Sequence, residues 1–388
     1  MQKKKLLVLT STFPRWKNDS KPSFVFDLCI RLSKQFDVFV LSPHFPGAKQ
    51  YENLDDVKVY RFKYFITRYQ KLSDMDGILA ALTNNKLNYM LIPFFLLGGL
   101  YALLKYSGKY KPNLIHAHWI IPQGLFAYVN YKILKIPYII TVHGSDIFKL
   151  KRLSYIKKLS LKNAKGITVV SDEINRKILK EIDSKLYTEV IPMGVDTHLF
   201  KPDIRNQSIL KTYGIKGPLL LFVGRIAPEK GIKYLIEAMP KIIEQYREIK
   251  LLIIGDGNQK KELKDLVKKK ELKEHIIFID SLSNKELPKY YATADIFVCP
   301  SLREGSPISY VESLACGTPI VVGDLPIGRE MTGDDRGEVA KQTDSNDLAH
   351  KIMILLRKNI CENDLFRYVK LKYDWETITD QFINVLTS

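Results

Sequence analysis

Short apolar runs that each end in a small or polar residue recur along this chain, and they constrain its fold more than any other feature. The first half holds LLVLT, VFVLS, LIHAHW, YIITVHG and GITVVS, and the second half holds LLLFVG, LLIIGDG, IIFID, DIFVCPS and PIVVG. Strands this uniformly apolar are covered on both faces, as in parallel sheets with helices above and below. Because the pattern runs twice, the sequence predicts an α/β protein with two doubly wound domains facing one another.

The boundary between these domains is predicted near PMGVDTHLFKP, residues 192–202, since a polar stretch and a new first strand follow it. A chain of 388 residues is also too long for one ordinary core. We expect an N-terminal domain over 1–199 and a C-terminal domain over 200–372. A final segment, 373–388, has apolar residues at helical spacing and is expected to pack back on the N-terminal domain.

The net charge of +18 is concentrated in the first half of the chain. Residues 1–200 hold 31 Lys and Arg against 15 Asp and Glu, a net charge of +16, and the remaining residues stand at +2. Such a basic half indicates an anionic partner. The candidates are a nucleic acid, a membrane surface and a phosphorylated substrate. The alternative is a general enrichment of lysine on solvated helices.

Cysteine usage and the N-terminus both indicate a cytoplasmic protein. The cysteines are scattered singly, without a CxxC pair or a Cys/His ligand spacing, which predicts reduced thiols and no zinc site. The apolar run in MQKKKLLVLTSTFP is only four residues long, so it is interpreted as a first strand and not as a signal peptide.

Residues 87–104 form an uncharged stretch of 18 residues, which reaches the lower limit for a transmembrane helix. The stretch also contains Pro93 and the pair Gly98–Gly99. Three interpretations are open: a buried helix, partial contact with a membrane, and a spanning helix. The sequence favours the buried helix.

A basic segment, residues 148–165, carries six Lys and one Arg among Leu, Ile and Tyr. It is either an amphipathic surface helix with its apolar face in the core or a helix that lies on an anionic membrane. In the second case, charge reversal at Lys157 and Lys158 weakens binding to anionic vesicles. No stacking aromatic motif interleaves the basic run, which argues against nucleic acid as the partner.

Two cations follow a predicted strand in LLLFVGRIAPEKG. Arg225 and Lys230 flank a short turn at the carboxyl end of this strand, where open α/β sheets bind their ligands. Together they can hold a diphosphate, Arg through its donor fork and Lys as a point charge. Gly224 and Gly255 end two such strands and let backbone amides approach a ligand. The alternatives are solvated loop charges and a simple tight turn.

Two glutamates lie eight positions apart in PSLREGSPISYVES. Ser306 is predicted to cap the next helix with Pro307 at its first position, so Glu304 lies in the loop and Glu312 about two turns inside. The amides of Gly305 and Ser306 then form an anion site. A sugar nucleotide meets these demands, with one carboxylate for ribose hydroxyls and the other for sugar hydroxyls. A solvated helix face with a capping loop is the alternative for Glu304.

These motifs resemble glycosyltransferase family 4, the retaining enzymes of the GT-B fold, in which two Rossmann-like domains face each other across a central cleft. The resemblance rests on FVGRIAPEKG, IIGDG, ADIFVCPSLREGSPISYVESLACGTPIVV and, earlier in the chain, HAHWIIPQG, VHGSD and IPMGVDTHLFKP. It covers essentially the whole chain.

The resemblance implies a role for each matching residue. Arg225 and Lys230 hold the donor diphosphate and stabilise its leaving charge. Glu304 contacts the transferred sugar and Glu312 holds the ribose. His118 of HAHW lies near the reacting sugar.

Further positions follow from the same resemblance. His143 and Asp146 of VHGSD line the cleft, whereas His116 is interpreted as a buried structural histidine. No metal is required if cations neutralise the leaving group, and the pair Asp74 and Asp76 of SDMDG is interpreted as a surface loop. The donor site also includes Gly224, Gly255, Gly305, Ser306 and Pro307.

The sequence thus predicts a retaining glycosyltransferase for cell-surface polysaccharide or glycolipid synthesis. It moves a hexose-type sugar from a UDP- or GDP-sugar to a glycan or lipid-linked acceptor held by the N-terminal domain. We expect it in the cytoplasm, peripherally at the inner face of the membrane. Two alternatives stay open, a GT-B-like sugar-nucleotide epimerase and a non-catalytic nucleotide-sugar-binding membrane-associated protein.

Overall fold

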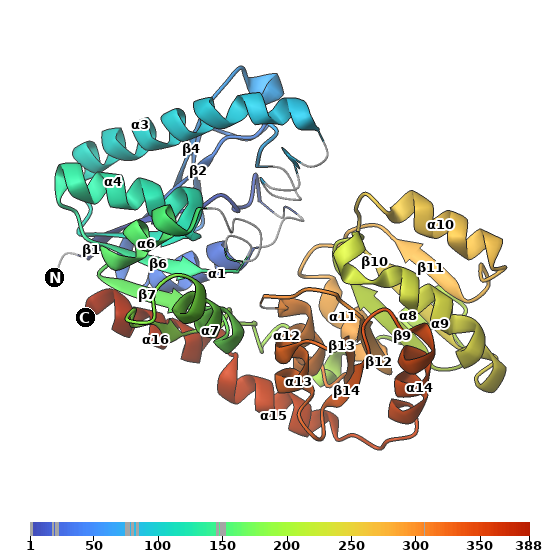
Figure 1. Ribbon diagram of the computed structural model, residues 1–388. Coiled ribbons are helices and arrows are strands. Elements are labelled where there is room, and N and C mark those ends of the chain that lie inside the picture. Colours follow the sequence, from blue (N-terminus) through green and yellow to red (C-terminus); the bar gives the residue numbers. More distant parts are fainter. Residues whose placement is uncertain are drawn as a thin grey trace. The chain divides into compact units, whose positions relative to one another are not determined.

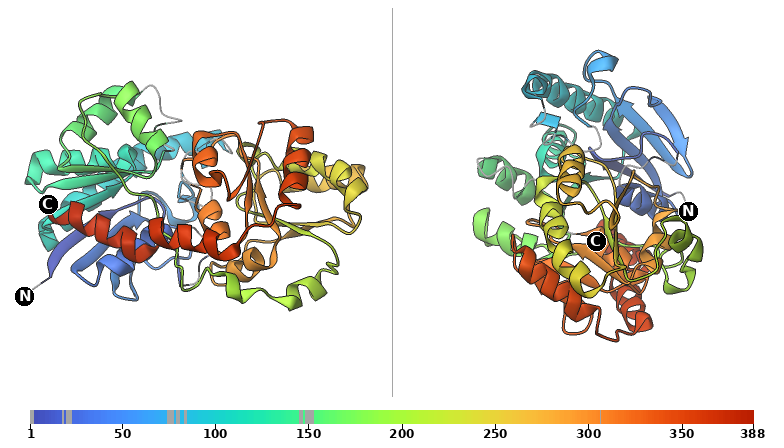
Figure 2. Two further views of the ribbon diagram at one scale, coloured as in Figure 1. Left: turned by 90° about the horizontal axis from the view of Figure 1, so that it is seen from below. Right: turned by 90° about the vertical axis from the view of Figure 1, so that its right-hand side faces the viewer.

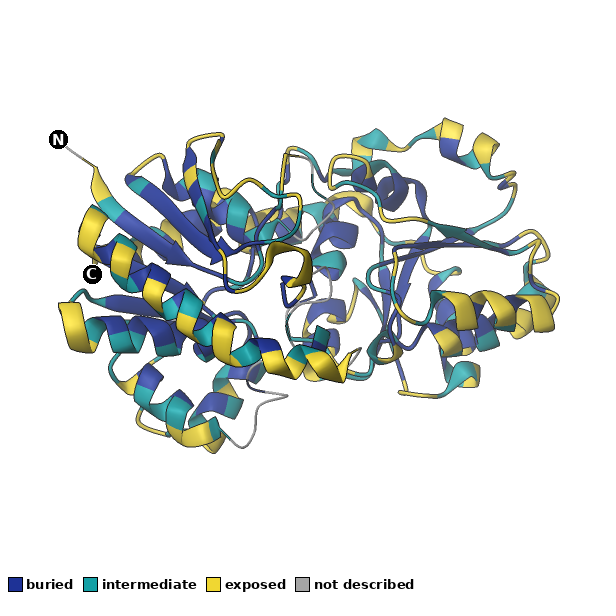
Figure 3. Cartoon of the chain, turned by 90° about the horizontal axis from the view of Figure 1, so that it is seen from above, coloured by how far each residue is buried: buried dark blue, intermediate teal, exposed yellow. Residues whose placement is uncertain are grey.

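The computed structural model divides the chain into two compact units, each built around one sheet (Figure 1). It describes residues 3–17, 19, 23–73, 78, 81–82, 85–144, 147, 153–305 and 307–388. The N-terminal unit comprises Met1–Met193 and Ile378–Ser388, and the C-terminal unit comprises Gly194–Thr377. Both sheets lie in the interior of their units, where Figure 3 colours them as buried.

The N-terminal unit has an eight-stranded sheet in the order β3-β4-β2-β1-β5-β6-β7-β8, in which β3 alone runs antiparallel to its neighbour. The strand order reverses between β1 and β5, so the carboxyl ends of these strands mark a ligand-binding point of the sheet. The strands are β1 Lys4–Leu9, β2 Phe36–Pro43, β3 Tyr51–Leu54, β4 Val57–Phe62, β5 Leu114–His118, β6 Tyr138–Val142, β7 Gly166–Val169 and β8 Glu189–Val190. The helices include α1 Phe24–Leu32, α3 Ile92–Tyr110, α4 Leu125–Leu134, α6 Ser154–Lys162 and α7 Asp172–Glu181.

The C-terminal unit has a six-stranded parallel sheet in the order β11-β10-β9-β12-β13-β14. This is the doubly wound order, and it reverses between β9 and β12. The strands are β9 Leu219–Val223, β10 Lys250–Ile254, β11 Ile276–Ile279, β12 Ile296–Cys299, β13 Ile320–Gly323 and β14 Gly337–Ala340. The helices are α8 Gln207–Thr212, α9 Ile232–Gln245, α10 Lys260–Lys269, α11 Leu287–Thr293, α12 Ile308–Ala315, α13 Pro326–Thr332, α14 Ser345–Leu355 and α15 Glu362–Lys372.

The predicted architecture of two doubly wound α/β domains is confirmed, and each of the ten apolar runs contains a strand. The sequence did not predict β3, β4, β8 and β14. Three of these lie at sheet edges, and β4 alternates buried and exposed residues where it begins. They therefore lack the continuous apolar run of a strand that is covered on both faces.

The last helix, α16 Trp375–Thr387, follows a single parallel bridge between Val195 and Asp374. From Ile378 onward this helix belongs to the N-terminal unit, where the Phe382 ring lies 5.7 Å from the ring of His116. Figure 2 shows this helix in red at the C-terminus. Residues far apart in sequence therefore complete one core.

The apolar segment 87–104 differs from the buried helix that the sequence favours. It forms a 3-10 turn, Lys86–Leu91, that continues into α3, and only 28% of its most apolar window is buried. The combined helix Lys86–Tyr110 is long and apolar enough to cross a membrane by length and composition alone. The prediction of a buried helix was wrong because apolar composition does not determine how much of a helix the rest of the chain covers.

The basic segment 148–165 corresponds in its described part to α6 and the residues beside it, because 148–152 lie outside the described residues. Lys157 is only 3% exposed, and Lys158 and Lys162 both pair with Asp183, at 3.2 and 3.1 Å. A buried ammonium cannot reach lipid headgroups. The structure therefore contradicts a role for Lys157 in membrane contact.

Candidate functional site

The loops after β9, β10 and β12 pack against one another at the carboxyl end of the C-terminal sheet. Gly231 has a φ of +66°, and a Cβ there would overlap the carbonyl oxygen of Pro300. Gly255 has a φ of +147°, and a Cβ there would overlap the carbonyl oxygen of Gly224. Close packing of the loops therefore requires glycine at both positions, and at Gly255 this adds to the ligand approach that the sequence predicts.

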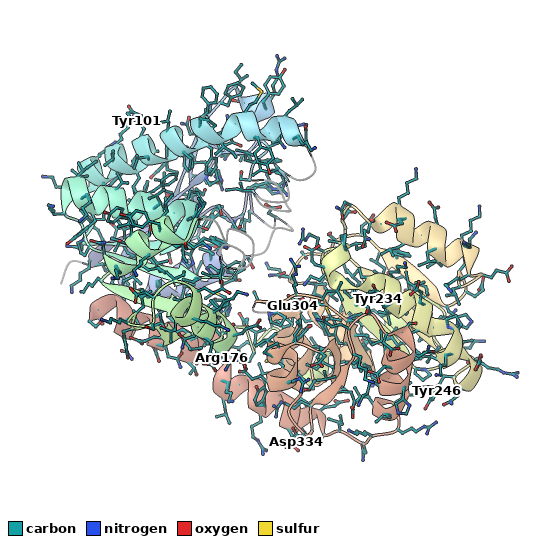
Figure 4. All side chains as sticks on the ribbon, in the orientation of Figure 1. Tyr101, Arg176, Tyr234, Tyr246, Glu304 and Asp334 are labelled. Atoms are coloured by element: carbon teal, nitrogen blue, oxygen red, sulfur yellow. The ribbon has the colours of Figure 1, made fainter. Side chains whose placement is uncertain are left out.

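An ion pair joins two of these loops where the strand order reverses. The Lys230 ammonium, at the end of the β9 loop, contacts Glu304 Oε1, in the loop between β12 and α12. The Ser301 hydroxyl donates a hydrogen bond of 2.8 Å to the same carboxylate oxygen. The two ion-pair side chains are only 19% and 10% exposed. Figure 4 labels Glu304 in this loop. The structure therefore brings together two predicted site residues that lie 74 positions apart.

The Lys230 ammonium is held in its charged form. Burial by itself lowers the pKa of Lys230, but the adjacent Glu304 carboxylate favours the charged form and outweighs that effect. The net result is a pKa above the ordinary value. Lys230 is therefore a fixed positive charge at neutral pH.

A second ion pair lies within the β9 loop. Arg225 contacts the carboxylate of Glu229, which lies four positions later, and both side chains are about one third exposed. The Leu302 amide also donates a 2.8 Å hydrogen bond to the Glu229 carbonyl, which ties this turn to the β12 loop. No role was predicted for Glu229, although an acid four residues after Arg225 in a short turn could have indicated the pair.

The start of α12 differs in detail from the prediction. The helix begins at Ile308, so Pro307 is its N-cap and Glu312 is its fifth residue, about one turn inside. Ser306 lies outside the described residues, and Gly305 precedes it in the same loop. The prediction of Pro307 at the first helical position and Glu312 two turns inside was therefore wrong by about one residue and one turn.

Glu312 is largely buried and has a tyrosine partner that the sequence analysis missed. The Tyr291 hydroxyl, on α11, donates a 2.9 Å hydrogen bond to Glu312 Oε2. Burial, and next the Glu312 carboxylate, raise the pKa of Tyr291 well above its ordinary value, so the phenol keeps its proton. This bond fixes the orientation of the carboxylate. No sequence signal joins these two residues, because they come from different helices.

In the N-terminal unit, histidine rings gather at the carboxyl ends of β5 and β6. His118 is fully buried, and its Nδ1 lies 2.9 Å from Nε2 of half-buried His143. Within the described part of the chain, Nε2 of His118 has no hydrogen-bond partner. The structure thus brings His118 and His143 together, whereas Asp146 lies outside the described residues.

These histidines are neutral at physiological pH. Burial lowers the pKa of His118 well below its ordinary value, and the neighbouring rings of His116 and His143 add to this effect. Burial likewise lowers the pKa of His116 to about 3. His116 lies fully inside the unit, with its Nε2 2.7 Å from the Thr141 hydroxyl. That environment fits a structural histidine.

The described residues contain no group of three or more His, Cys, Asp or Glu side chains that could hold a metal ion. Asp74 and Asp76 lie outside the described residues, so the structure does not test the surface loop predicted there.

Two family models match the chain, one in each half. "Glycosyltransferase Family 4" matches residues 23–199, and "Glycosyl transferases group 1" matches residues 206–371. A relative described as an uncharacterised glycosyltransferase of Methanocaldococcus jannaschii is 31% identical over 275 residues, which are 68% of this chain and 72% of the relative. The alpha-monoglucosyldiacylglycerol synthase of Streptococcus pneumoniae is 26% identical over 253 residues, which are 61% of this chain and 57% of that enzyme.

Solved structures of GT-B glycosyltransferases share the fold. The sucrose-phosphate synthase of Thermosynechococcus elongatus superposes with a TM-score of 0.81 at 19% identity, covering 99% of this chain and 98% of that one. The Anabaena protein HepE in complex with UDP-glucose superposes with a TM-score of 0.74 at 16% identity, covering 99% of both chains. The fold is therefore GT-B, and with both family models matched the chain belongs to glycosyltransferase family 4.

Proposed function

We propose that this glycosyltransferase is a retaining enzyme that transfers a hexose-type sugar from a UDP- or GDP-sugar to a glycan or lipid-linked acceptor, without a metal ion. The observation that carries the proposal is the Lys230–Glu304 pair at the point where the C-terminal sheet reverses its strand order. Open α/β sheets bind nucleotides at such points. A cation beside a carboxylate meets the two demands of a sugar nucleotide, which carries phosphate charge next to hydroxyl groups.

In this proposal Arg225 and Lys230 bind the donor diphosphate. Arg225 offers a fork of N–H donors to phosphate oxygens, and Lys230 supplies a fixed positive charge. When the bond between the anomeric carbon and the diphosphate oxygen breaks, the electron pair goes to the diphosphate. The two cations then stabilise the developing charge, which is the role that a metal ion has in other enzymes of this kind of chemistry.

The carboxylates position the hydroxyl groups of the donor. Glu304 is oriented by Lys230 and Ser301, and it accepts hydrogen bonds from hydroxyls of the transferred sugar. Glu312, oriented by Tyr291, accepts hydrogen bonds from the ribose. Groups that are held in place before the substrate binds lose little freedom on binding, so most of the barrier reduction comes from positioning.

We infer retention from the resemblance to family 4, and in that case the acceptor hydroxyl attacks from the face that the diphosphate leaves. The new bond forms between the anomeric carbon and the acceptor oxygen, and the acceptor proton passes to the departing diphosphate. The unpartnered Nε2 of neutral His118 supports a role for this side chain in hydrogen bonding near the reacting sugar. No enzyme nucleophile is needed in this scheme.

Two observations support a lipid-linked acceptor at a membrane. The first 200 residues carry a net charge of +16, which favours anionic headgroups or a lipid phosphate. The relative from Streptococcus pneumoniae is named for a glycolipid product. We propose the same class of acceptor for this chain.

A thermal-shift screen of UDP-, GDP- and ADP-sugars followed by a transfer assay tests the proposal. The bound donor stabilises the fold by mass action, about 2.7 kcal/mol at 100 times its Kd. We expect a shift with a UDP- or GDP-sugar and transfer of labelled sugar to a membrane lipid extract in excess chelator. Release of an altered sugar without acceptor would support an epimerase, and binding without any turnover would support a non-catalytic protein. Metal-dependent transfer would contradict the metal-free scheme.

A further inference from the structure

One stripe of α3 and of the turn before it is apolar and faces solvent. Met90, Phe94, Leu97 and Tyr101 follow one another at intervals of three or four residues, and their exposed fractions lie between 49% and 71%. Residues at this spacing share one face of a helix. Figure 4 shows Tyr101 pointing away from the N-terminal unit. Exposed apolar side chains that gather on one face are typical of an interaction site.

A neighbouring loop extends this stripe. Phe65, Ile66 and Tyr69 are also exposed, and the Phe65 ring lies 5.0 Å from the ring of Phe94. Loop and helix thus form one surface. We refer to it below as the apolar face, which comprises Phe65, Ile66, Tyr69, Met90, Phe94, Leu97 and Tyr101.

The opposite side of α3 is fixed in the core of the N-terminal unit. A Cβ at Gly99 would lie 2.7 Å from the Phe126 ring, so α4 packs directly on this glycine. Further along, the side chains of Asn130 and buried Ser107 are joined by a 3.0 Å hydrogen bond. A spanning helix would have to leave these contacts. The helix can therefore lie along a membrane but not cross it in this fold.

The charges along α3 and α4 have one sign. Residues 77–145, which include α3 and α4, contain six Lys and no Asp or Glu. Lys86 precedes the stripe, and Lys105 and Lys109 follow it, with the Lys105 ammonium 5.9 Å from the Tyr101 ring centre. Apolar and aromatic side chains flanked by lysine are typical of helices that lie in the interface of an anionic bilayer.

This charge distribution indicates which partner binds the apolar face. A symmetric contact between two copies of the chain would bring these lysines toward like charges, which is unfavourable. An anionic lipid surface instead pairs the lysines with headgroups while the apolar side chains enter the acyl boundary. We propose that the apolar face docks the protein onto an anionic membrane through α3.

Helix α6 offers fewer free charges for this role. Its Lys157 is buried, and Lys158 and Lys162, although partly exposed, share Asp183. The inference needs neither the proposed donor nor the proposed acceptor, because membrane docking is measured without turnover. A negative result for membrane docking therefore does not contradict the proposed sugar transfer, and a negative result for sugar transfer does not contradict membrane docking.

Co-sedimentation of the full chain with vesicles tests the inference. We expect binding to vesicles of phosphatidylglycerol and phosphatidylcholine that weakens at high salt, and weaker binding to phosphatidylcholine alone. The double variant Leu97→Ser/Tyr101→Ser removes two exposed side chains and should lower the vesicle partition coefficient about 10- to 100-fold. Lys105→Glu/Lys109→Glu should reduce binding to the anionic vesicles while binding to the neutral ones stays as it was.

The matched control is Tyr155→Ser, because Tyr155 is equally exposed but lies on α6. Its binding should equal that of the unchanged protein, and all variants should keep the same thermal unfolding midpoint. The inference is overturned if the unchanged protein ignores anionic vesicles at low salt, or if Leu97→Ser/Tyr101→Ser binds as well as the control. A dimer in analytical ultracentrifugation that this double variant dissociates would assign the face to a second copy and also overturn it.

Discussion

The two units present different chemistry at the carboxyl ends of their central strands. Beside β9 and β12, the C-terminal unit holds Lys230 against Glu304, and Arg225 against Glu229. Beside β5 and β6, the N-terminal unit holds His118 close to the ring of His143, and burial lowers the pKa of His118. The same type of sheet thus presents fixed ions in one unit and neutral rings in the other.

This difference matches a division of tasks between the units of a sugar-nucleotide enzyme. A departing diphosphate requires positive charge that is already oriented, and in the proposed function Arg225 and Lys230 of the C-terminal unit supply it. An acceptor hydroxyl requires hydrogen-bond partners, and a neutral imidazole offers both a donor and an acceptor. We therefore expect changes of charge to have large effects in the C-terminal unit and changes of pH to act first on the N-terminal unit.

The largest expected effect is the loss of the buried ion pair. Lys230→Met leaves the Glu304 carboxylate buried without its cation, which should lower the free energy of unfolding by about 3–5 kcal/mol. Chemical denaturation followed by circular dichroism measures this change. Lys233→Met is the control, because Lys233 lies on α9 and is exposed. A loss below about 1 kcal/mol for Lys230→Met would mean that the pair adds no more than a surface ion pair.

The next largest effect is expected for Gly231→Ala, which tests the close packing of the loops. Gly231→Ala places a Cβ against the Pro300 carbonyl at a positive φ, and it should cost about 2–4 kcal/mol of unfolding free energy. Gly214 also has a positive φ, of +59°, but a Cβ there would meet no atom within 4 Å. Gly214→Ala should therefore cost only about 1–2 kcal/mol. Equal losses for both variants would show that backbone strain alone, and not the approach of the loops, requires glycine at Gly231.

How much of this could be predicted from the sequence depends on how local the signal is. Ten strands were predicted because each contains a continuous apolar run, which is typical of strands covered on both faces. The edge strands β3, β8 and β14 lack that signal. In the C-terminal site, the sequence indicated Arg225, Lys230 and the two glutamates because each lies beside the end of a strand.

Side-chain contacts and the exposed face of each helix could not be predicted from the sequence. The bond between Tyr291 and Glu312 joins two helices that share no sequence pattern. The exposure of α3 and the burial of Lys157 depend on which face of a helix its neighbours cover. Composition does not contain that information, so the sequence favoured a buried helix at 87–104 and allowed a membrane contact at Lys157, and the structure contradicts both.

Substitution of Arg225 should weaken donor binding with little effect on the stability of the fold. Its partner Glu229 is partly exposed, so Arg225→Ala should change the free energy of unfolding by less than about 1 kcal/mol. The same variant should weaken nucleoside diphosphate binding by about 1.5–3 kcal/mol, because it removes a charge-assisted hydrogen bond. Isothermal titration measures the affinity, with Lys233→Ala as the control. An unchanged affinity would remove Arg225 from the donor site.

The smallest effect per variant concerns pH and the N-terminal unit. Because the folded-state pKa of His118 lies below the unfolded value near 6.5, its contribution to stability is present above that pH and is lost as the pH falls below it. Each buried histidine lowers the free energy of unfolding by up to about 1.4 kcal/mol per pH unit below pH 6.5. His118→Phe should therefore make the decline between pH 6.5 and pH 5 shallower by about this slope.

The control for this pH dependence is His350→Phe, because His350 lies exposed on α14 in the C-terminal unit. Denaturation at a series of pH values would show an unchanged slope for the control and a reduced slope for His118→Phe. If both variants keep the slope of the unchanged protein, the histidine rings of the N-terminal unit take up protons without unfolding. They would then be charged near pH 6, and the contrast between an ionic C-terminal site and a neutral N-terminal one would not hold.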